Sequence, residues 1–408
     1  MKKILFEAVT LLEPEMTAFL SELVSYPAIC PVDGGRGEGP KAQFIIRKIE
    51  ELGLGEPEIV SAPDDKAEGG ARPNILLRIP GRSNKRLWII SHMDVVPVGD
   101  ISLWNTDPFE AVVRDGCIFA RGANDNGQEL AASLYAAAAL KKCGVTPEYE
   151  VCLCMVADEE VGSDHGIKYL IRQGLFNADD LIVVPDGGCE DGSFIEIAEK
   201  SILWIEFEVI GKQAHGSMPH VGNNACRAAN ELSVSLDSAL HRAFPDEDKL
   251  FSPDVSTFEP TRRMQNVENI NTIPGRERFS FDCRVLPGIS LDTVVSVVDA
   301  EVKKIERKFG VTVSYAFPQK VQAPQATPED AEVVELLKRA VAEVIPVALK
   351  VGGIGGGTCA AYFREVGIPA VVWDQEADVA HMPNEYARIE HMVNEAKVFA
   401  FMMAGGAD

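Results

Sequence analysis

Short apolar segments alternate with helical segments over the first half of the chain. The clearest apolar segments lie at 86–91, 149–157 and 180–184, and each has the length of a strand. Residues 127–144, between the first two, are rich in alanine and leucine and end at a glycine, which is typical of a buried helix. This alternation predicts an α/β fold with a mostly parallel sheet.

The middle of the chain follows a different pattern. Residues 201–211 alternate between apolar and polar positions, which predicts a strand with one buried face. Amphipathic helices are expected near 223–241 and at 290–309. Further strands are expected near 267–273, at 277–286 and at 311–317. The resulting order, β-α-β-β-α-β, is that of a ferredoxin-like unit.

The last part of the chain returns to the first pattern, with a glycine run at 352–357 and a strand at 368–373. We therefore expect residues 1–200 and 320–408 to form one α/β domain. Residues 201–319 are expected to form an inserted ferredoxin-like α+β domain. Hydrophobic residues make up 46% of the 408 positions and charged residues 25%, so both domains can bury a core.

The chain is strongly acidic, with 39 basic and 62 acidic residues and a net charge of −23. Phosphate backbones and anionic lipid surfaces repel such a protein, so we expect neither a nucleic-acid partner nor a membrane partner. No targeting signal is expected, because Glu7, Glu13 and Glu15 interrupt the apolar start. No membrane span is expected either, because no stretch approaches the roughly 18 uncharged apolar residues that one needs. Nine cysteines without a C-x-x-C pair are typical of reduced thiols and predict a cytoplasmic protein.

Histidine and acidic side chains follow the ends of several predicted strands. Their positions are His92, Asp125, Glu159, Glu160, Asp186 and His381. In an open parallel sheet, the loops at the carboxyl ends of the strands meet in one crevice, so we expect these side chains to lie together. Imidazole and carboxylate groups are ligands that divalent metals such as zinc take in proteins.

A pair of metal ions needs one bridging carboxylate, together with a histidine and a second carboxylate for each ion. That set is supplied by His92, Asp125, Glu160, Asp186 and His381. Glu159 then remains as a general base that takes a proton from the attacking water and passes it to the departing amine. Asp94, two residues beyond His92, is expected to accept the other imidazole N–H and fix the tautomer of His92.

The order and wording of several motifs resemble metallopeptidase family 20, from about residue 70 to the C-terminus. The motifs are SHMDVVPVGD, WNTDPFEAVVRDG, FARGANDNG, DEEVGS, PDGG, GKQAHGSMP, NTIPG, FDCRVLPG, GGGTCAAYF and HMPNEY. Members of that family include succinyl-diaminopimelate desuccinylase, acetylornithine deacetylase, aminoacylase, carboxypeptidase G and several di- and tripeptidases. The resemblance implies a catalytic domain with two divalent metal ions, zinc or else cobalt, and an inserted lid through which the protein forms a homodimer.

The resemblance also implies roles for the metal-binding residues. His92 and Asp186 correspond to ligands of one zinc ion. Glu160 and His381 correspond to ligands of the other ion, and Asp125 to the carboxylate that bridges the two. The peptide bond after the bridging aspartate is expected to be cis.

Further residues correspond to catalytic and substrate-binding groups of the family. Glu159 matches the general base and Asp94 the residue that orients the histidine. His215 matches a lid histidine that reaches the active site of the partner subunit and stabilises the tetrahedral oxyanion. Asn271 corresponds to a lid residue that helps to polarise the scissile carbonyl.

Two features are candidates for binding a substrate carboxylate. Arg284 matches a lid arginine that grips this group, and the alternative is a solvated arginine on a strand. Gly355, Gly356, Gly357 and Thr358 are expected to form a nest of backbone N–H groups, although a strand-to-helix turn also needs glycine.

These observations predict a dinuclear-metal hydrolase that cleaves the amide bond of a small peptide or an N-acyl amino acid. The cues to its substrate conflict. Asp186 is typical of peptidase members of the family, whereas the motif wording is closer to proteins named desuccinylase, so an N-succinyl or N-acetyl amino acid deacylase is the alternative. A catalytically silent binding protein and a thiol hydrolase built on Cys154 or Cys359 are more distant alternatives.

Overall fold

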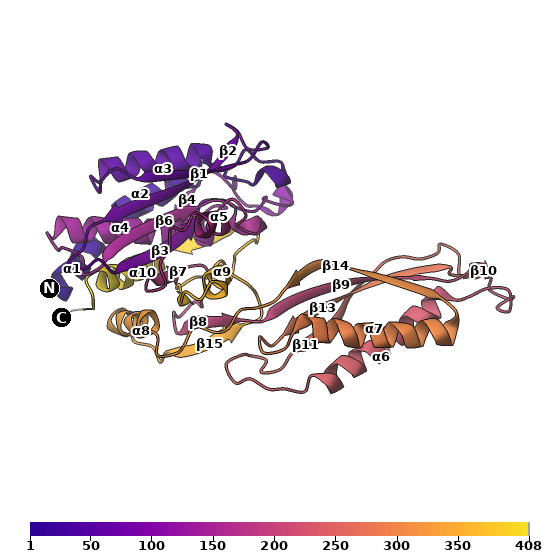
Figure 1. The fold of residues 1–408 in the computed structure, drawn as a ribbon. Helices are drawn as coiled ribbons and strands as arrows, with labels where there is room; N and C mark the ends of the chain where they lie inside the picture. Colours follow the sequence, from indigo (N-terminus) through magenta and orange to yellow (C-terminus); the bar gives the residue numbers. More distant parts are fainter. Residues whose placement is uncertain (407–408) are drawn as a thin grey trace. The chain divides into compact units, whose positions relative to one another are not determined.

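The computed structural model describes residues 1–406. The chain divides into two compact units, each with its own core (Figure 1). Unit 1 comprises Met1–Ile197, Thr327–Gly352 and the described residues from Thr358 onward. Unit 2 comprises Ala198–Ala326 and Gly353–Gly357.

Unit 1 contains an eight-stranded sheet in the order β1-β2-β6-β3-β7-β16-β8-β15. The strands are β1 (Glu58–Pro63), β2 (Ala71–Ile79), β3 (Arg86–His92), β6 (Glu150–Val156), β7 (Leu181–Val184), β8 (Phe194–Glu199), β15 (Lys350–Ile354) and β16 (Ala370–Val372). The central strands β6, β3, β7 and β16 run parallel, whereas β1, β2 and β8 pair antiparallel. This mixed, mostly parallel sheet confirms the predicted α/β fold.

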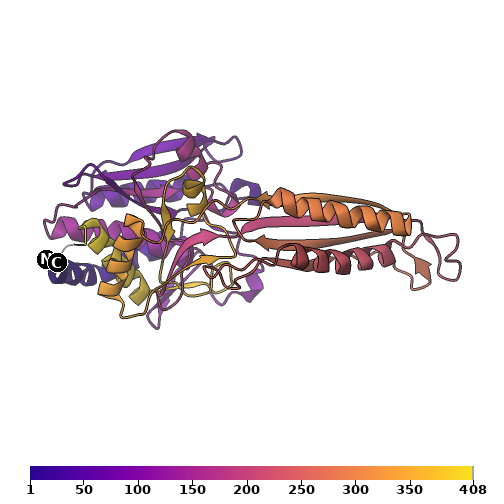
Figure 2. The same cartoon turned by 60° about the horizontal axis from the view of Figure 1, so that its bottom comes forward.

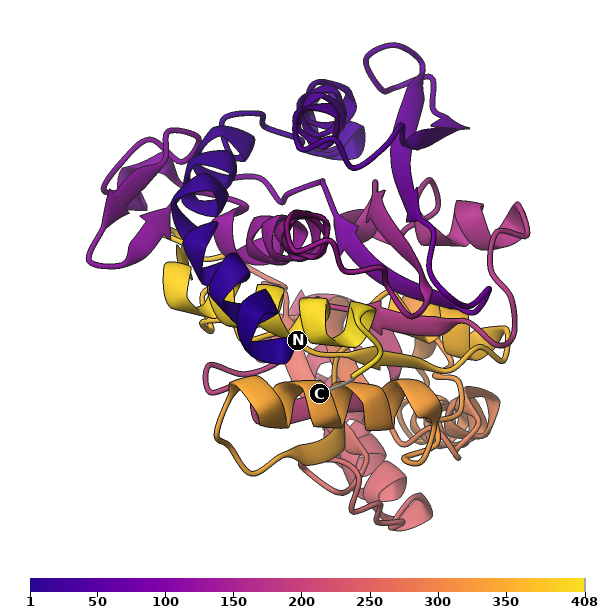
Figure 3. The same ribbon diagram turned by 90° about the vertical axis from the view of Figure 1, so that its left-hand side faces the viewer.

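Helices cover the sheet of unit 1 (Figure 3). They are α1 (Lys2–Leu11), α2 (Glu13–Leu23), α3 (Gly39–Glu51), α4 (Gln128–Lys142), α5 (Ile167–Arg172), α8 (Glu332–Val344), α9 (Ala360–Glu365) and α10 (Ile389–Met403). Helix α4 is buried on nearly every side, because it packs against β3, β6 and α10. Trp88 and Ile90 of β3 belong to a buried apolar cluster that also contains Phe363 of α9.

Short elements connect these parts. The helical turns are η1 (Pro31–Asp33), η2 (Ile101–Leu103), η3 (Ala123–Gly127) and η4 (Glu159–Val161). A small sheet in the order β17-β5-β4 is built from β4 (Val112–Arg114), β5 (Cys117–Phe119) and β17 (Tyr386–Arg388). None of the helices within residues 1–406 is long and apolar enough to cross a bilayer.

Unit 2 is a four-stranded antiparallel sheet with two helices along it (Figure 2). Its elements are β9 (Ser201–Ile210), α6 (Ala225–Ala243), β11 (Thr257–Arg263), β13 (Arg276–Val285), α7 (Leu291–Phe309) and β14 (Thr312–Val321). The sheet order is β11-β13-β9-β14, which is the ferredoxin-like arrangement expected from the sequence. A two-stranded ribbon pairs β10 (Ala214–His215) with β12 (Thr272–Ile273).

One strand of unit 2 lies elsewhere than predicted. A strand was expected near 267–273, but that stretch contributes only the two residues of β12. The second strand of the four-stranded sheet, in chain order, is β11 instead. Strand β11 lies at the sheet edge, pairs only with β13, and buries only Phe258. An edge strand tolerates Pro260 and charged residues, so its sequence lacks the alternation that identifies a half-buried strand.

Candidate metal centre

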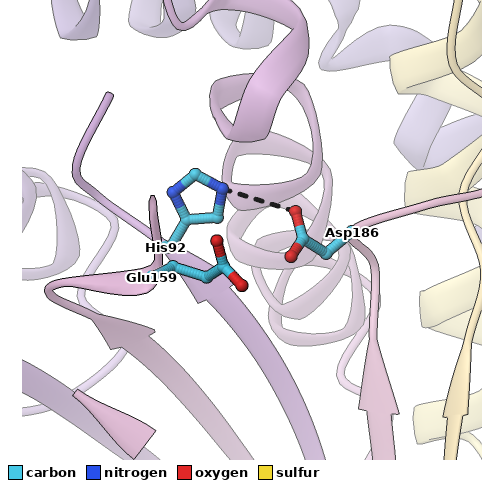
Figure 4. A group of neighbouring side chains, drawn as sticks. All are labelled: His92, Glu159 and Asp186. Atoms are coloured by element: carbon cyan, nitrogen blue, oxygen red, sulfur yellow. Dashed lines mark ion pairs between the residues drawn. The ribbon is translucent and has the colours of Figure 1, made fainter. Parts of the chain in front are cut away.

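His92 closes strand β3 at its carboxyl end, where the side chains of two other segments meet it. The Nε2 atom of His92 lies 2.8 Å from Oδ1 of Asp125 and 3.4 Å from Oδ1 of Asp186. Figure 4 shows the carboxylate of Glu159 beside the side chains of His92 and Asp186, and ligand atoms of these three residues lie within 4.8 Å of one another. These groups could hold one metal ion.

A second group forms around the other oxygen of Asp125. The Nε2 atom of His381 lies 3.1 Å from Oδ2 of Asp125 and 3.0 Å from Oε2 of Glu160. The two carboxylate oxygens of Asp125 therefore face two different histidines, which is the arrangement that a bridging ligand needs. The Asp125–Asn126 peptide bond is cis, as the motif resemblance implied.

Asp94 holds both His92 and the paired glutamates. Its backbone carbonyl lies 3.0 Å from Nδ1 of His92, and its Oδ1 atom lies 3.6 Å away. Its two carboxylate oxygens accept the backbone N–H groups of Glu159 at 3.0 Å and Glu160 at 3.1 Å. Since the carbonyl accepts from Nδ1, the Nε2 lone pair of His92 is left for a metal.

A buried ion network supports the turn that carries the two glutamates. Asp158 precedes this turn in the left-handed conformation, with φ of 67°. Its Oδ1 accepts from Nη1 of Arg72 at 3.1 Å, and its Oδ2 accepts the backbone N–H of His165 at 2.9 Å. Arg72 also pairs with Glu38, and both side chains are fully buried. The sequence contains these residues, but no motif indicated that they meet.

Asn126 connects two of the ligand-bearing strands. Its Oδ1 accepts the backbone N–H of His92 at 3.1 Å, and its Nδ2 donates to the carbonyl of Pro185, next to Asp186. Asn126 lies in the motif FARGANDNG, yet sequence reasoning assigned it no role. Its contacts fix the spacing between the ends of β3 and β7.

The electrostatics of the centre favour cations. Burial raises the pKa of Glu159 well above its usual range and that of Glu160 to about 7. Hydrogen bonds to Asp125 and Glu160 raise the pKa of His381 to about 10. The Oε1 atom of Glu160 is buried and has no hydrogen-bond partner within the described chain. Clustered carboxylates, two imidazoles and an unpartnered buried oxygen fit a pair of divalent metal ions.

Two candidate residues of unit 2 lie in or next to the small ribbon, His215 in β10 and Asn271 just before β12. His215 is exposed in β10, and its Nδ1 accepts the backbone N–H of Ser217 at 3.2 Å. The neutral imidazole therefore carries its proton on Nε2, which can donate a hydrogen bond. Asn271 is exposed, and its backbone carbonyl accepts the backbone N–H of Gly216 at 2.6 Å.

Arg284, also in unit 2, is already paired. Its Nε and Nη2 donate to the carboxylate of Asp282 at 2.7 and 3.0 Å, and its Nη1 donates to the carbonyl of Gly355 at 2.8 Å. None of Gly355–Gly357 adopts the left-handed conformation. Thr358, in unit 1, accepts the backbone N–H of Ala360 at the start of α9.

The two cysteines considered as nucleophiles lie in the protein core. Cys154 in β6 is 1% exposed and Cys359 is 2% exposed. Burial raises the pKa of the Cys154 thiol, which disfavours the reactive thiolate. All nine cysteines are free thiols. These observations disfavour a thiol hydrolase.

Comparison with known proteins identifies the family. The family model described as Peptidase family M20/M25/M40 matches residues 88–404. The chain belongs to this family. An uncharacterized metallohydrolase of Methanocaldococcus jannaschii is 40% identical over 400 residues, which cover 93% of this chain and 96% of the relative. A succinyl-diaminopimelate desuccinylase of a Nitratiruptor species is 28% identical over 395 residues, which cover 94% of this chain and 98% of the relative.

Solved structures of the M20 family share the fold. A tripeptidase of Staphylococcus aureus superposes with a TM-score of 0.75 at 17% identity, over 96% of this chain and 98% of that chain. The family match and the 40% identical metallohydrolase confirm the family predicted from the motifs and the prediction of a metal-dependent hydrolase.

Proposed function

We propose that this M20 protein is a dinuclear zinc hydrolase that cleaves the amide bond of a small peptide or an N-acyl amino acid. The observation that carries the proposal is the position of Asp125, whose two oxygens face His92 on one side and His381 on the other. Asp186 completes the first metal subsite and Glu160 the second.

Bound divalent metal ions supply Lewis-acid chemistry at such a site, by polarising a carbonyl and lowering the pKa of water. Glu159 takes a proton from the attacking water and delivers it to the departing amine nitrogen. Its half-buried carboxylate, whose pKa is raised chiefly by desolvation, suits both halves of this proton transfer. Asp94 orients His92 and, through its two accepted N–H groups, holds Glu159 in place.

Unit 2 supplies most of the substrate-facing residues in this proposal, and Thr358 of unit 1 is the exception. His215 donates from Nε2 to the developing oxyanion in the partner subunit of a homodimer, and Asn271 assists it. Arg284 and the segment Gly355–Thr358 bind a substrate carboxylate. The bond from Arg284 to the carbonyl of Gly355 supports a common role, because it joins the two elements of this carboxylate site.

Deacylation of an N-succinyl or N-acetyl amino acid is the second candidate. It is supported by several curated relatives that are named succinyl-diaminopimelate desuccinylase. The free thiols support the expected reducing, cytoplasmic compartment.

A hydrolysis panel tests the proposal and separates the two candidates. Metal-free protein would be reconstituted with zinc or cobalt and assayed with dipeptides, tripeptides, N-acetyl amino acids and N-succinyl amino acids. We expect cleavage that a chelator abolishes, and the preferred class of substrate identifies the activity. Cleavage that persists after complete metal removal would contradict the proposal.

A further inference from the structure

A buried ion pair joins the segments that carry Asp125 and His381. The Oε1 atom of Glu385 accepts the backbone N–H groups of Asn124 at 3.0 Å and Asp125 at 3.1 Å. Its Oε2 atom accepts from Nη1 of Arg121. The Nη2 atom of Arg121 donates to the backbone carbonyl of His381 at 3.2 Å. The pair therefore holds both backbones, and within residues 1–406 it makes no hydrogen bond to the side chain of either ligand.

The small sheet places this pair beside the metal centre. Strands β5 and β17 run antiparallel, with Phe119 opposite Tyr386. The backbone N–H of Ala120 donates to the backbone carbonyl of Glu385 at 3.1 Å. The hydrogen bonding between the two strands therefore continues up to Ala120, the residue before Arg121. Arg121 is 2% exposed and Glu385 is fully buried.

The two metal subsites differ in how their ligands are held. His92 lies within the central sheet and Asp186 lies two residues after the end of strand β7, so the ladders of neighbouring parallel strands support the first subsite. His381 lies in a loop with φ of 63°, and its side chain is 55% exposed. No strand contains His381, so the second subsite depends on other contacts for its geometry.

We propose that Arg121 and Glu385 are positioning residues that set the affinity of the second metal subsite, formed by Asp125, Glu160 and His381. This inference rests on the proposed function. The pair fixes the distance between the loop of His381 and the backbone of Asp125, so the ligands keep a geometry that a metal ion accepts. Contacts that orient metal ligands typically change metal affinity by about 10–100-fold.

A planar guanidinium is required for this task. Arg121 bonds a carboxylate and a carbonyl at the same time through two nitrogens, whereas the single ammonium of a lysine cannot reproduce that fork. The variant Arg121→Lys therefore keeps the charge but loosens the link to His381. The variant Glu385→Gln places an amide beside Arg121 and tests the same link from the other strand.

Arg364 offers a matched control. It is similarly buried, pairs with Glu196 at 2.7 Å, and donates from Nη2 to the carbonyl of Ala370 at 3.1 Å. The variant Arg364→Lys therefore makes the same chemical change at another buried ion pair of unit 1.

The experiment is calorimetric titration of the metal-free full-length protein with Zn²⁺, together with the metal content of the dialysed product. In the wild type we expect two binding events. In Arg121→Lys and in Glu385→Gln we expect one event to weaken by about 10–100-fold while the other stays within about twofold. Arg364→Lys should leave both events unchanged. Excess Zn²⁺ should restore most of the kcat of Arg121→Lys.

Several results would overturn the inference. Unchanged affinities in both variants, or equal weakening of both events, would contradict selective control of the second subsite. A wild type with two events and an unaffected Arg121→Lys would remove this inference but leave the proposed function standing. A wild type that shows fewer than two zinc-binding events would contradict both this inference and the proposed function. Circular dichroism would show whether each variant folds. If Arg121→Lys does not fold, Glu385→Gln alone tests the inference.

Discussion

The interiors of unit 1 and unit 2 differ in the kind of side chain that they bury. The core of unit 2 is an apolar cluster in which the rings of Phe207 and Phe279 stack with their centres 4.8 Å apart. Unit 1 has an apolar sheet as well, but it also buries more charged side chains, such as Asp94, Arg121 and Glu395, than unit 2, in which Glu277 and Glu301 are among those buried. Apolar burial stabilises a fold directly, whereas a buried charge costs free energy unless it is paired.

This difference indicates what each interior is for. In unit 2, the packed rings and aliphatic side chains hold a scaffold, so its core substitutions should change stability. In unit 1, buried polar groups cluster around the candidate metal centre, so substitutions there should change metal binding, catalysis or pH dependence. Four substitutions test this contrast.

The largest effect is expected at Glu159. The variant Glu159→Gln keeps the shape of the side chain but cannot take a proton from water. We expect kcat to fall by about 10²–10⁴-fold while the metal content stays unchanged. Glu206→Gln in strand β9 of unit 2 is the control and should leave both quantities unchanged. Near-normal turnover of Glu159→Gln would contradict its role as the base.

A large effect on stability is expected at Phe281. This ring is 1% exposed and lies 6.2 Å from the ring of Phe207. We expect Phe281→Ala to lower the free energy of unfolding of unit 2 by about 3–5 kcal/mol, because the substitution leaves a cavity. Denaturation would be followed by the fluorescence of Trp204, which lies in β9.

Metal content measured on native Phe281→Ala separates the two interiors. We expect it to match that of the wild type, since the proposed ligands lie in unit 1. Val234→Ala, at a position 69% exposed on α6, should change the stability of unit 2 little. Loss of metal together with the loss of stability would contradict the separation of the two interiors.

A pH-dependent effect is expected at Glu395 in unit 1. Burial raises the pKa of this carboxyl to about 8, from a usual value of 4.5. The folded state therefore favours the neutral acid, and the stability it contributes is present below about pH 4.5 and is lost as the pH rises through about 8. Glu395→Gln cannot ionise, so its stability relative to the wild type should increase with pH, by on the order of 1–3 kcal/mol at about pH 7.

Urea unfolding between about pH 5 and 9 measures this difference. Glu365→Gln, at an exposed position of α9, is the control and should follow the wild type across the range. Parallel pH profiles for Glu395→Gln and the wild type would show that this carboxyl is not held neutral in the fold.

The smallest effect is expected at a surface ion pair of unit 2. Lys308 pairs with Glu231, and their side chains are 58% and 39% exposed. Solvent and salt screen such a pair, so Lys308→Ala should change the free energy of unfolding by at most about 1 kcal/mol. A larger loss in chemical denaturation would mean that charge, as well as apolar packing, holds unit 2 together.

The strands of the central sheet could be predicted because each is buried on both faces. Strands β3, β6 and β7 are continuous apolar runs, which the sequence shows directly. Strand β11 could not be predicted, because it lies at an edge and contains Pro260 and several charged residues. The hydrophobic pattern thus identifies buried strands and misses those that tertiary pairing alone creates.

The candidate metal site follows the same rule. Residues such as His92 and Asp186 were identifiable because each follows a predicted strand. Arg121 and Glu385 were not, although both lie in recognised motifs, because they are 264 residues apart and only the fold brings them together. Sequence patterns show where donors lie, whereas the contacts that position those donors emerge from the three-dimensional packing.

The most direct test of the dinuclear centre is the zinc stoichiometry of the wild type and of His381→Ala, measured by elemental analysis after dialysis. With Asp125 between two subsites, we predict about two zinc ions per chain in the wild type and about one in His381→Ala. One zinc ion or fewer in the wild type, or two in His381→Ala, would contradict the bridging role of Asp125.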